Sequence, residues 1–264
     1  MPGHRITVDG IGIHLQDTGP RDGAPLVLLH ALGTDLRIWD TVVPLLPERL
    51  RVVRIDMRGH GLSDCPSGPY KMGRLVSDAE AIMEALALKD AVVLGLSIGG
   101  MIAQGLAVKR LDLVRGLILA CTGAKIGTPA LWADRIRAAE AEGLDALADA
   151  TLARWFPEPF RSGPDAALTR TLMLRQPVAG WTGCAAAIAG TDYYTPTSGL
   201  RLPTLAIAGD RDGSTPPDLV RETAGLIPGA RFVLLRKTGH LPCVDAAPAF
   251  AQAVSGFLTD IGHL

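Results

Sequence analysis

The sequence lacks the features that would tie it to nucleic acid, to a membrane or to a secretory route. Its 26 basic and 27 acidic residues leave a net charge of −1, which provides no electrostatic attraction for nucleic acid or a membrane surface. No long apolar run is present, and the first ten residues have no apolar signal-peptide core. We therefore expect a cytoplasmic protein that binds neither nucleic acid nor membrane.

The few cysteines form no recognisable metal or disulfide pattern. Cys65, Cys121, Cys184 and Cys243 lie far apart, and none belongs to a Cys-x-x-Cys pair. This spacing argues against a zinc site, a redox pair and a disulfide framework. A chain of 264 residues buries roughly 70% of its unfolded surface, so its core is sufficient without cross-links.

What the sequence does contain is an alternation of strand-like and helix-like segments. Residues 5–8 and 11–17 flank Asp9-Gly10, a favoured pair for a two-residue hairpin turn. Nearly continuous Val/Leu/Ile runs, typical of parallel strands buried on both faces, follow at 25–30, 51–56, 91–95, 116–120, 203–209 and 230–235. Helical patterns occur at 75–88, 98–110 and 248–258. The alternation predicts a doubly wound α/β fold, with a mostly parallel sheet and an N-terminal antiparallel hairpin.

The alternation is interrupted between residues 124 and 195, where no strand-like run occurs. This stretch is rich in Ala, Leu, Arg and Glu, and we interpret it as four short helices inserted between the sixth and seventh strands. Because an α/β sheet binds its ligand beyond the carboxyl ends of its strands, the insertion should form a cap there. The expected organisation is a core of residues 1–123 and 196–264 with a helical cap of residues 124–195.

The clearest local motif is Gly95-Leu96-Ser97-Ile98-Gly99, between the strand 91–95 and the helix 98–110. In this context Gly-x-Ser-x-Gly is typical of a nucleophile elbow, in which a serine occupies a sharp, strained turn between small neighbours. We predict that Ser97 is a nucleophile. The Ile98 amide, at the helix N-terminus, is then a candidate oxyanion donor.

A serine nucleophile requires a general base, which for this motif comes last in the chain, after an acid. Only His240 and His263 follow Ser97. His263 lies next to the final residue and is expected to be solvated. His240 follows the last core strand and is the predicted base.

The acid is expected after the strand 203–209, where Asp210 and Asp212 both occur. The position of the strand end alone does not separate them, since either can be a turn residue. Thr215 and Pro216 resemble an N-cap and the first residue of the next helix.

The loop after the strand 25–30 should supply the second oxyanion donor, and the Leu32 amide is the candidate. His30, in the same loop, has no ligand partner at metal spacing and is expected to be structural. A contact between Asp56 and Arg58 is expected to hold a tight turn rather than to take part in chemistry.

Several segments carry a resemblance to a known family: LLHALGTDLRIWD, RIDMRGHGLSD, GLSIGG, IAGDRDGSTPP and KTGHLPCVD. Together they resemble the α/β-hydrolase family over nearly the whole chain. In this family the acid lies three residues after a glycine, so Gly209 points to Asp212. The resemblance implies a Ser97–Asp212–His240 triad, oxyanion amides at Leu32 and Ile98, and no metal or organic cofactor.

The cap segments GAKIGTPALWADRIRAAEAEG and LARWFPEPFR resemble those of the enol-lactonases in this family. That resemblance implies a small-molecule substrate with a carboxylate beside an unsaturated five-membered lactone ring. A cap arginine should bind the carboxylate, since guanidinium groups make bidentate contacts with it. The candidates are Arg135, on the helix face of Trp132, and Arg154, beside Trp155.

Residues 29–31 and 191–200 depart from the enol-lactonase pattern and are expected to border the acyl pocket. The alternatives are a carboxylesterase, a perhydrolase, a C–C bond hydrolase, or a ligand-binding receptor on a hydrolase scaffold.

Overall fold

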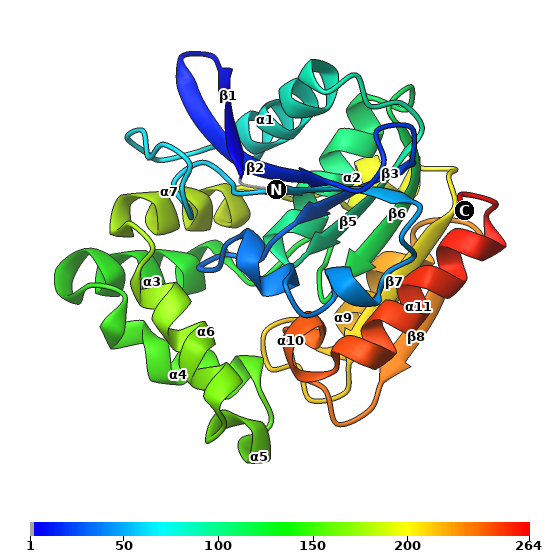
Figure 1. The fold of residues 1–264 in the computed structure, drawn as a ribbon. Coiled ribbons are helices and arrows are strands. Elements are labelled where there is room, and N and C mark those ends of the chain that lie inside the picture. The colour runs from blue at the N-terminus through cyan, green and yellow to red at the C-terminus, as the bar shows by residue number, and fades with distance from the viewer. Residues whose placement is uncertain (1–2) are drawn as a thin grey trace.

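The computed structural model describes residues 3–264 as one eight-stranded sheet with helices on both faces (Figure 1). The strands are β1 His4–Val8, β2 Ile11–Thr18, β3 Ala24–Leu29, β4 Leu50–Ile55, β5 Ala91–Leu96, β6 Val114–Ala120, β7 Thr204–Gly209 and β8 Arg231–Leu235. Their order is β1-β2-β4-β3-β5-β6-β7-β8. The pairs β1–β2 and β2–β4 are antiparallel, and the remaining pairs are parallel. The predicted fold is confirmed.

Local sequence explains both kinds of strand. Asp9 and Gly10 have φ angles of 48° and 81°, as the predicted two-residue turn requires, and Val8 pairs with Ile11 across it. The central strands β4, β5 and β7 are buried along their whole length, in keeping with their continuous apolar runs.

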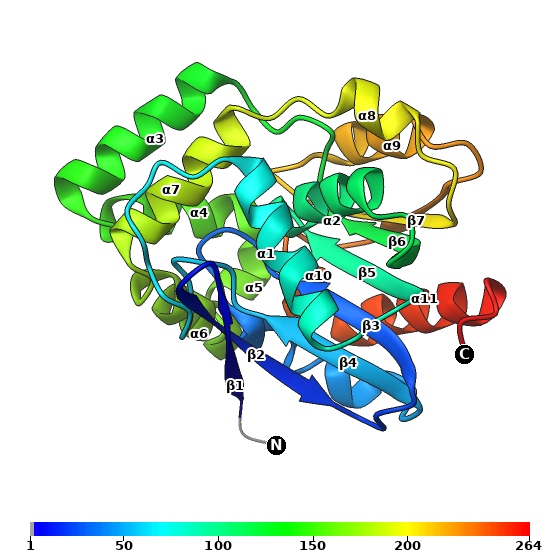
Figure 2. The same cartoon turned by 90° about the horizontal axis from the view of Figure 1, so that it is seen from above.

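Helices cover the two faces of the sheet unequally. α1 (Met72–Ala85), α2 (Ile98–Lys109) and α9 (Pro217–Gly225) lie on one face, and α11 (Ala247–Asp260) lies on the other (Figure 2). The short helices η1 (Leu36–Trp39), η2 (Val43–Leu45) and α10 (Pro242–Asp245) pack with α11 or with each other. The loops after β7 and β8 are hydrogen-bonded to the inserted helix α4 (Asp145–Trp155), so the inserted helices lie at the carboxyl ends of these strands.

The segment between β6 and β7 contains more helices than predicted. Between β6 and β7 the chain forms α3 Pro129–Glu142, α4 Asp145–Trp155, α5 Glu158–Arg161, α6 Pro164–Leu174, α7 Val178–Ala189 and α8 Tyr194–Ser198. The prediction of four helices missed α5 and α8, because a helix of about one turn leaves no apolar periodicity to detect. α3 packs on α7 and α4, and α4 packs on α6.

Two predicted local environments are wrong. His263 is buried, and its Nε2 lies 3.0 Å from the Pro25 carbonyl oxygen, because the chain end packs beside the start of β3. Arg58 does not pair with Asp56: its Nη2 lies 2.6 Å from Asp78 Oδ1 on α1. Asp56 instead accepts hydrogen bonds from backbone amides, including that of Leu36.

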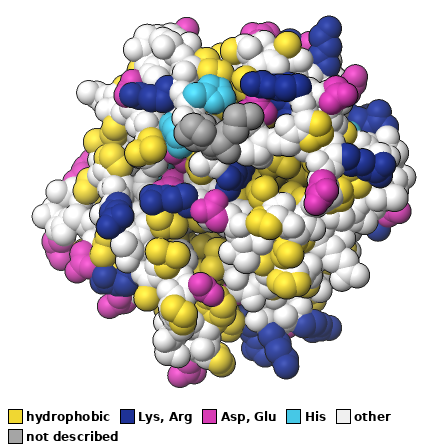
Figure 3. Space-filling model, viewed as in Figure 1, with side chains coloured by type: hydrophobic (Ala, Val, Ile, Leu, Met, Phe, Trp, Pro, Cys, Tyr) yellow, Lys and Arg dark blue, Asp and Glu magenta, His cyan; other side chains and the backbone are white. Residues whose placement is uncertain are grey.

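The face of the molecule seen in Figure 1 is of mixed charge. Figure 3 shows basic and acidic side chains interspersed over the face seen in Figure 1. Within residues 3–264, no helix is both long enough and apolar enough to span a bilayer.

Candidate active site

Ser97 occupies the sharp turn between β5 and α2. Its φ of 57° and ψ of −118° are strained for a residue with a side chain. A methyl group at Gly95 would collide with the Gly99 carbonyl, and one at Gly99 would collide with the Leu29 carbonyl of β3. The two glycines of the motif are therefore required by close backbone approach, as the elbow geometry demands.

His240 and Asp212 are hydrogen-bonded to each other and buried. His240 Nδ1 lies 2.8 Å from Asp212 Oδ2. The carboxylate also accepts hydrogen bonds from the Ser214 amide (2.7 Å), the Thr215 amide (2.9 Å) and the Thr215 hydroxyl (2.7 Å). Burial by itself raises the pKa of Asp212, but His240 and the donated hydrogen bonds outweigh it, so the pKa is lowered. Asp212 is therefore held as a carboxylate facing the imidazole.

Neighbouring residues have other roles than their sequence pattern suggested. Asp210 accepts a hydrogen bond from the Thr238 amide at 3.2 Å and does not bond His240. Thr215 is not an N-cap, because its hydroxyl is engaged with Asp212, and α9 begins at Pro217 after an extended Pro216.

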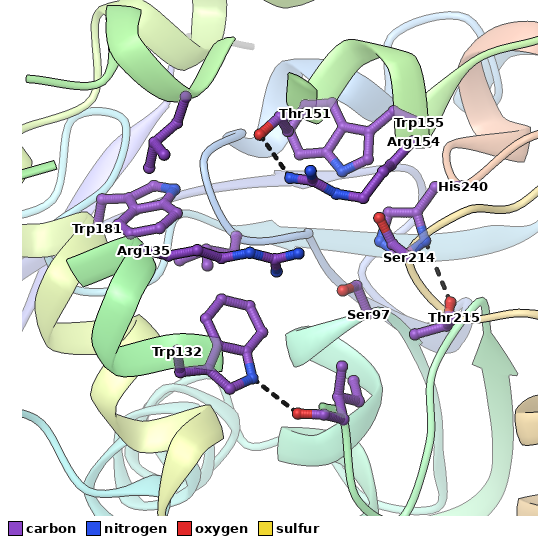
Figure 4. A pocket seen from close by; sticks show the side chains of 13 residues that line it. Ser97, Trp132, Arg135, Thr151, Arg154, Trp155, Trp181, Ser214, Thr215 and His240 are labelled. Carbon is purple, nitrogen blue, oxygen red and sulfur yellow. Dashed lines mark hydrogen bonds between the residues drawn. The ribbon is translucent and has the colours of Figure 1, made fainter. Parts of the chain in front are cut away.

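A small cavity of about 50 Å³ brings most of the predicted site residues together. Its lining residues are Leu32, Ser97, Ile126, Trp132, Arg135, Leu147, Thr151, Arg154, Trp155, Trp181, Ser214, Thr215 and His240. Figure 4 shows Arg135 and Arg154 reaching into this space from two cap helices, with Ser97 and His240 on its wall.

The lining also departs from expectation. Within the described chain, neither residues 29–31 nor residues 191–200 contribute to it, so the expectation that they border the pocket is wrong. Nothing in the sequence indicated Trp181 on α7, which lines the pocket where α7 packs on α3. Thr151 and Leu147 lie on α4 one and two turns before Arg154, a spacing that would have identified them once Arg154 was placed.

Both candidate arginines carry charge without an acidic partner. In residues 3–264 neither forms an ion pair. The Arg135 guanidinium carbon lies 4.9 Å from the Trp132 ring centroid. Arg154 donates from Nη2 to the Thr151 hydroxyl at 2.9 Å, and its buried Nε has no hydrogen-bond partner within the described chain.

The electrostatics of this pair are unfavourable without a counter-charge. Desolvation lowers the pKa of Arg135, while desolvation and then the charge of Arg135 lower the pKa of Arg154 to about 10. Half-buried cations without a counter-charge destabilise a fold. An anion bound between the two guanidinium groups would relieve this cost.

The two candidate oxyanion donors come from different parts of the core. Leu32 lines the pocket, and Ile98 is the first residue of α2. Neither backbone N–H donates to another group within residues 3–264. Both amides are thus free to bind a developing negative charge.

One cluster contains metal-ligating residue types, Cys121, Asp212 and His240, whose ligand atoms lie within 4.8 Å of one another. Asp212 and His240 already bond each other, and burial, followed by the Asp212 charge, raises the pKa of the Cys121 thiol well above its usual value. A neutral thiol is a poor metal ligand, so this donor set suits a hydrogen-bonded dyad better than a cation.

Comparison with known proteins supports the fold and the broad activity. The alpha/beta hydrolase fold family profile matches residues 24–247. The 3-oxoadipate enol-lactonase 1 of Acinetobacter baylyi is 30% identical over 254 residues, covering 96% of this chain and 95% of that protein. The enol-lactonase structure from Burkholderia xenovorans LB400 is 35% identical, with a TM-score of 0.93 over 97% of this chain and 99% of that one.

An esterase is also similar. The thermophilic esterase from Thermogutta terrifontis, solved with malate bound, is 30% identical, with a TM-score of 0.91 over 99% of both chains. The chain belongs to the alpha/beta hydrolase fold family, and its relatives include both lactonases and esterases.

Proposed function

We propose that the protein is a serine hydrolase that opens the ring of a carboxylate-bearing enol-lactone, 3-oxoadipate enol-lactone, in the breakdown of aromatic compounds. The observation that supports this most is the pair of unpaired arginines, Arg135 and Arg154, in the same small pocket as Ser97 and His240. Similarity to two 3-oxoadipate enol-lactonases supports the choice of substrate.

In the proposed reaction His240 takes the proton of Ser97 as the serine oxygen attacks the lactone carbonyl carbon. Asp212 keeps the proton of His240 on Nδ1 and stabilises the imidazolium that forms. The ring C–O bond then breaks. The enolate that leaves remains tethered to the acyl group. It takes up the proton held by His240 and becomes a ketone, which leaves His240 neutral again.

The amides of Leu32 and Ile98 stabilise the tetrahedral oxyanion, and a donor of this kind contributes about 2.7–4 kcal/mol. A water molecule that His240 activates next attacks the acyl-enzyme carbonyl and releases the acid. The substrate carboxylate binds the two guanidinium groups, which Trp132 and Thr151 hold in place. No step in this reaction needs a metal or an organic cofactor.

Steady-state kinetics with a substrate panel test the proposal. The panel contains 3-oxoadipate enol-lactone, the neutral α-angelica lactone (the same ring with a methyl in place of the carboxymethyl group) and p-nitrophenyl acetate. We expect kcat/KM to be highest for the carboxylated lactone. Arg135→Gln and Arg154→Gln should remove that preference, whereas an unchanged preference in both variants would contradict carboxylate recognition.

Hydrolysis of a carboxylate-bearing ester is the second candidate, because the similar Thermogutta enzyme is an esterase with a dicarboxylate bound. Adding the monomethyl ester of a short dicarboxylic acid to the panel separates the two. A non-catalytic receptor is tested by labelling with an organophosphonate, since stoichiometric reaction at Ser97 requires an activated nucleophile.

A further inference from the structure

The last turn of α4 is bonded to both loops that carry the acid and the base. The Arg154 carbonyl accepts a hydrogen bond from the Gly213 amide at 2.9 Å, and the Trp155 carbonyl accepts one from the His240 amide at 2.7 Å. The final carbonyls of a helix have no partner within it. Here these two are satisfied by residues next to Asp212 and by the base itself.

The last turn of α4 packs closely against these two loops, with little room for either to move. A methyl group at Gly239 would collide with the Trp155 carbonyl, and one at Gly213 would lie 3.1 Å from the Arg154 Cα. The Trp155 ring stacks on His240, with centroids 6.3 Å apart and planes at 22°. A shift of this turn would therefore also shift His240, because both the Trp155 carbonyl and the Trp155 ring contact it.

The same residues face the substrate cavity. The guanidinium of Arg154 points into the pocket while its carbonyl holds the acid loop (Figure 4). Without a counter-charge, desolvation, repulsion from Arg135 and the unpartnered Nε of Arg154 disfavour this position of the guanidinium. An anion bound between the guanidinium groups removes that repulsion. It therefore stabilises the position of the turn in which its carbonyls are hydrogen-bonded to the two loops.

We propose that the last turn of α4 couples anion binding at Arg154 to the alignment of His240 and Asp212, so that the substrate carboxylate increases turnover as well as affinity. Trp155 is thus a positioning residue for the base. The proposal rests on the proposed function, since it takes the carboxylate of the substrate as the anion. Remote binding groups that raise kcat in this manner are a recognised use of binding energy.

A substrate supplied in two pieces tests the coupling. α-Angelica lactone lacks the carboxylate, and formate supplies one separately. We expect saturating formate to raise kcat for α-angelica lactone by about fivefold or more, the lower end of common coupling strengths. Formate should also compete with the carboxylated lactone. Competition without any rise in kcat for the neutral lactone would overturn the coupling and leave carboxylate recognition intact. Absence of competition would overturn both.

A glycine variant separates binding from coupling. Gly239→Ala adds a methyl group against the Trp155 carbonyl and changes no side chain that lines the pocket. Formate should still compete with the carboxylated lactone in this variant, but it should no longer raise kcat for α-angelica lactone. Stimulation at the wild-type level would contradict the coupling.

Two further variants complete the test. Gly256→Ala on α11 adds its methyl group in open space and is the matched control, so it should keep the stimulation. Gly213→Ala presses on the Arg154 Cα from the acid loop and replaces Gly239→Ala if that variant does not fold. We expect it to reduce the stimulation while competition by formate remains. Full stimulation in Gly213→Ala would also contradict the coupling.

Discussion

Arg154 should lower the stability of the empty enzyme, and its replacement tests this directly. Arg154→Met keeps an apolar stem of similar length and removes the charge. A fall in pKa from 12.5 to about 10 would correspond to ~3 kcal/mol if the group were fully shielded from water. Because the side chain is only half-buried, we discount this for solvent screening to ~1–2 kcal/mol.

The variant should therefore unfold at a temperature roughly 2–6 °C higher than the wild type, as followed by calorimetry without ligand. Its kcat/KM for the carboxylated lactone should fall roughly 10- to 150-fold, which corresponds to the loss of one hydrogen bond to a charged group. Arg161→Met, on α5 outside the pocket lining, is the control and should alter neither quantity.

The reasoning would be refuted by a lower melting temperature in Arg154→Met. It would also be refuted by an equal loss of activity on the carboxylated and the neutral lactone, since a loss of that kind reports a damaged catalytic centre rather than a lost carboxylate contact.

Three other predictions concern single side chains. Ser97→Ala should melt like the wild type and lose nearly all hydrolysis, and turnover at the wild-type rate would exclude the nucleophile. Asp212→Asn should lower kcat by roughly 10⁴-fold. Asp210→Asn alters only a contact with the Thr238 amide and a 3.9 Å ion pair with Arg236, so it should retain most activity. Steady-state kinetics on both variants check the ranking, and the reverse order would identify Asp210 as the acid. Burial raises the pKa of Asp245 from 3.8 to about 7, so its stabilising contribution is complete below pH 3.8 and is lost as the pH rises through 7. The wild type should therefore lose ~2 kcal/mol relative to Asp245→Asn between about pH 5.5 and 8.5 in urea unfolding, and parallel pH curves would contradict this.

Features encoded by neighbouring residues were predictable from the sequence. The hairpin turn follows from Asp9-Gly10, and the elbow follows from glycines flanking Ser97 between a strand and a helix. Both depend on backbone conformations that only a few residue types favour, so the residue pattern predicts the backbone geometry.

Features that depend on remote partners were not predictable. Arg58 bonds Asp78 and His263 bonds the Pro25 carbonyl, and nothing near either residue in the chain indicates those partners. The sequence also left Arg135 and Arg154 as alternatives. The structure places both at one pocket because α3 packs against α4.

The attachment of α4 to the loops of the core restricts how ligands enter and leave. A cap that swung outward as a rigid lid would pull its helix end away from Gly213 and His240 and leave two amides and two carbonyls unpaired. If the ligand instead passes between individual side chains of the cap, those four groups stay hydrogen-bonded. Attempts to admit bulkier molecules are therefore better directed at trimming the walls, for instance at Leu147 or Trp181, than at loosening the segments that join the cap to the sheet.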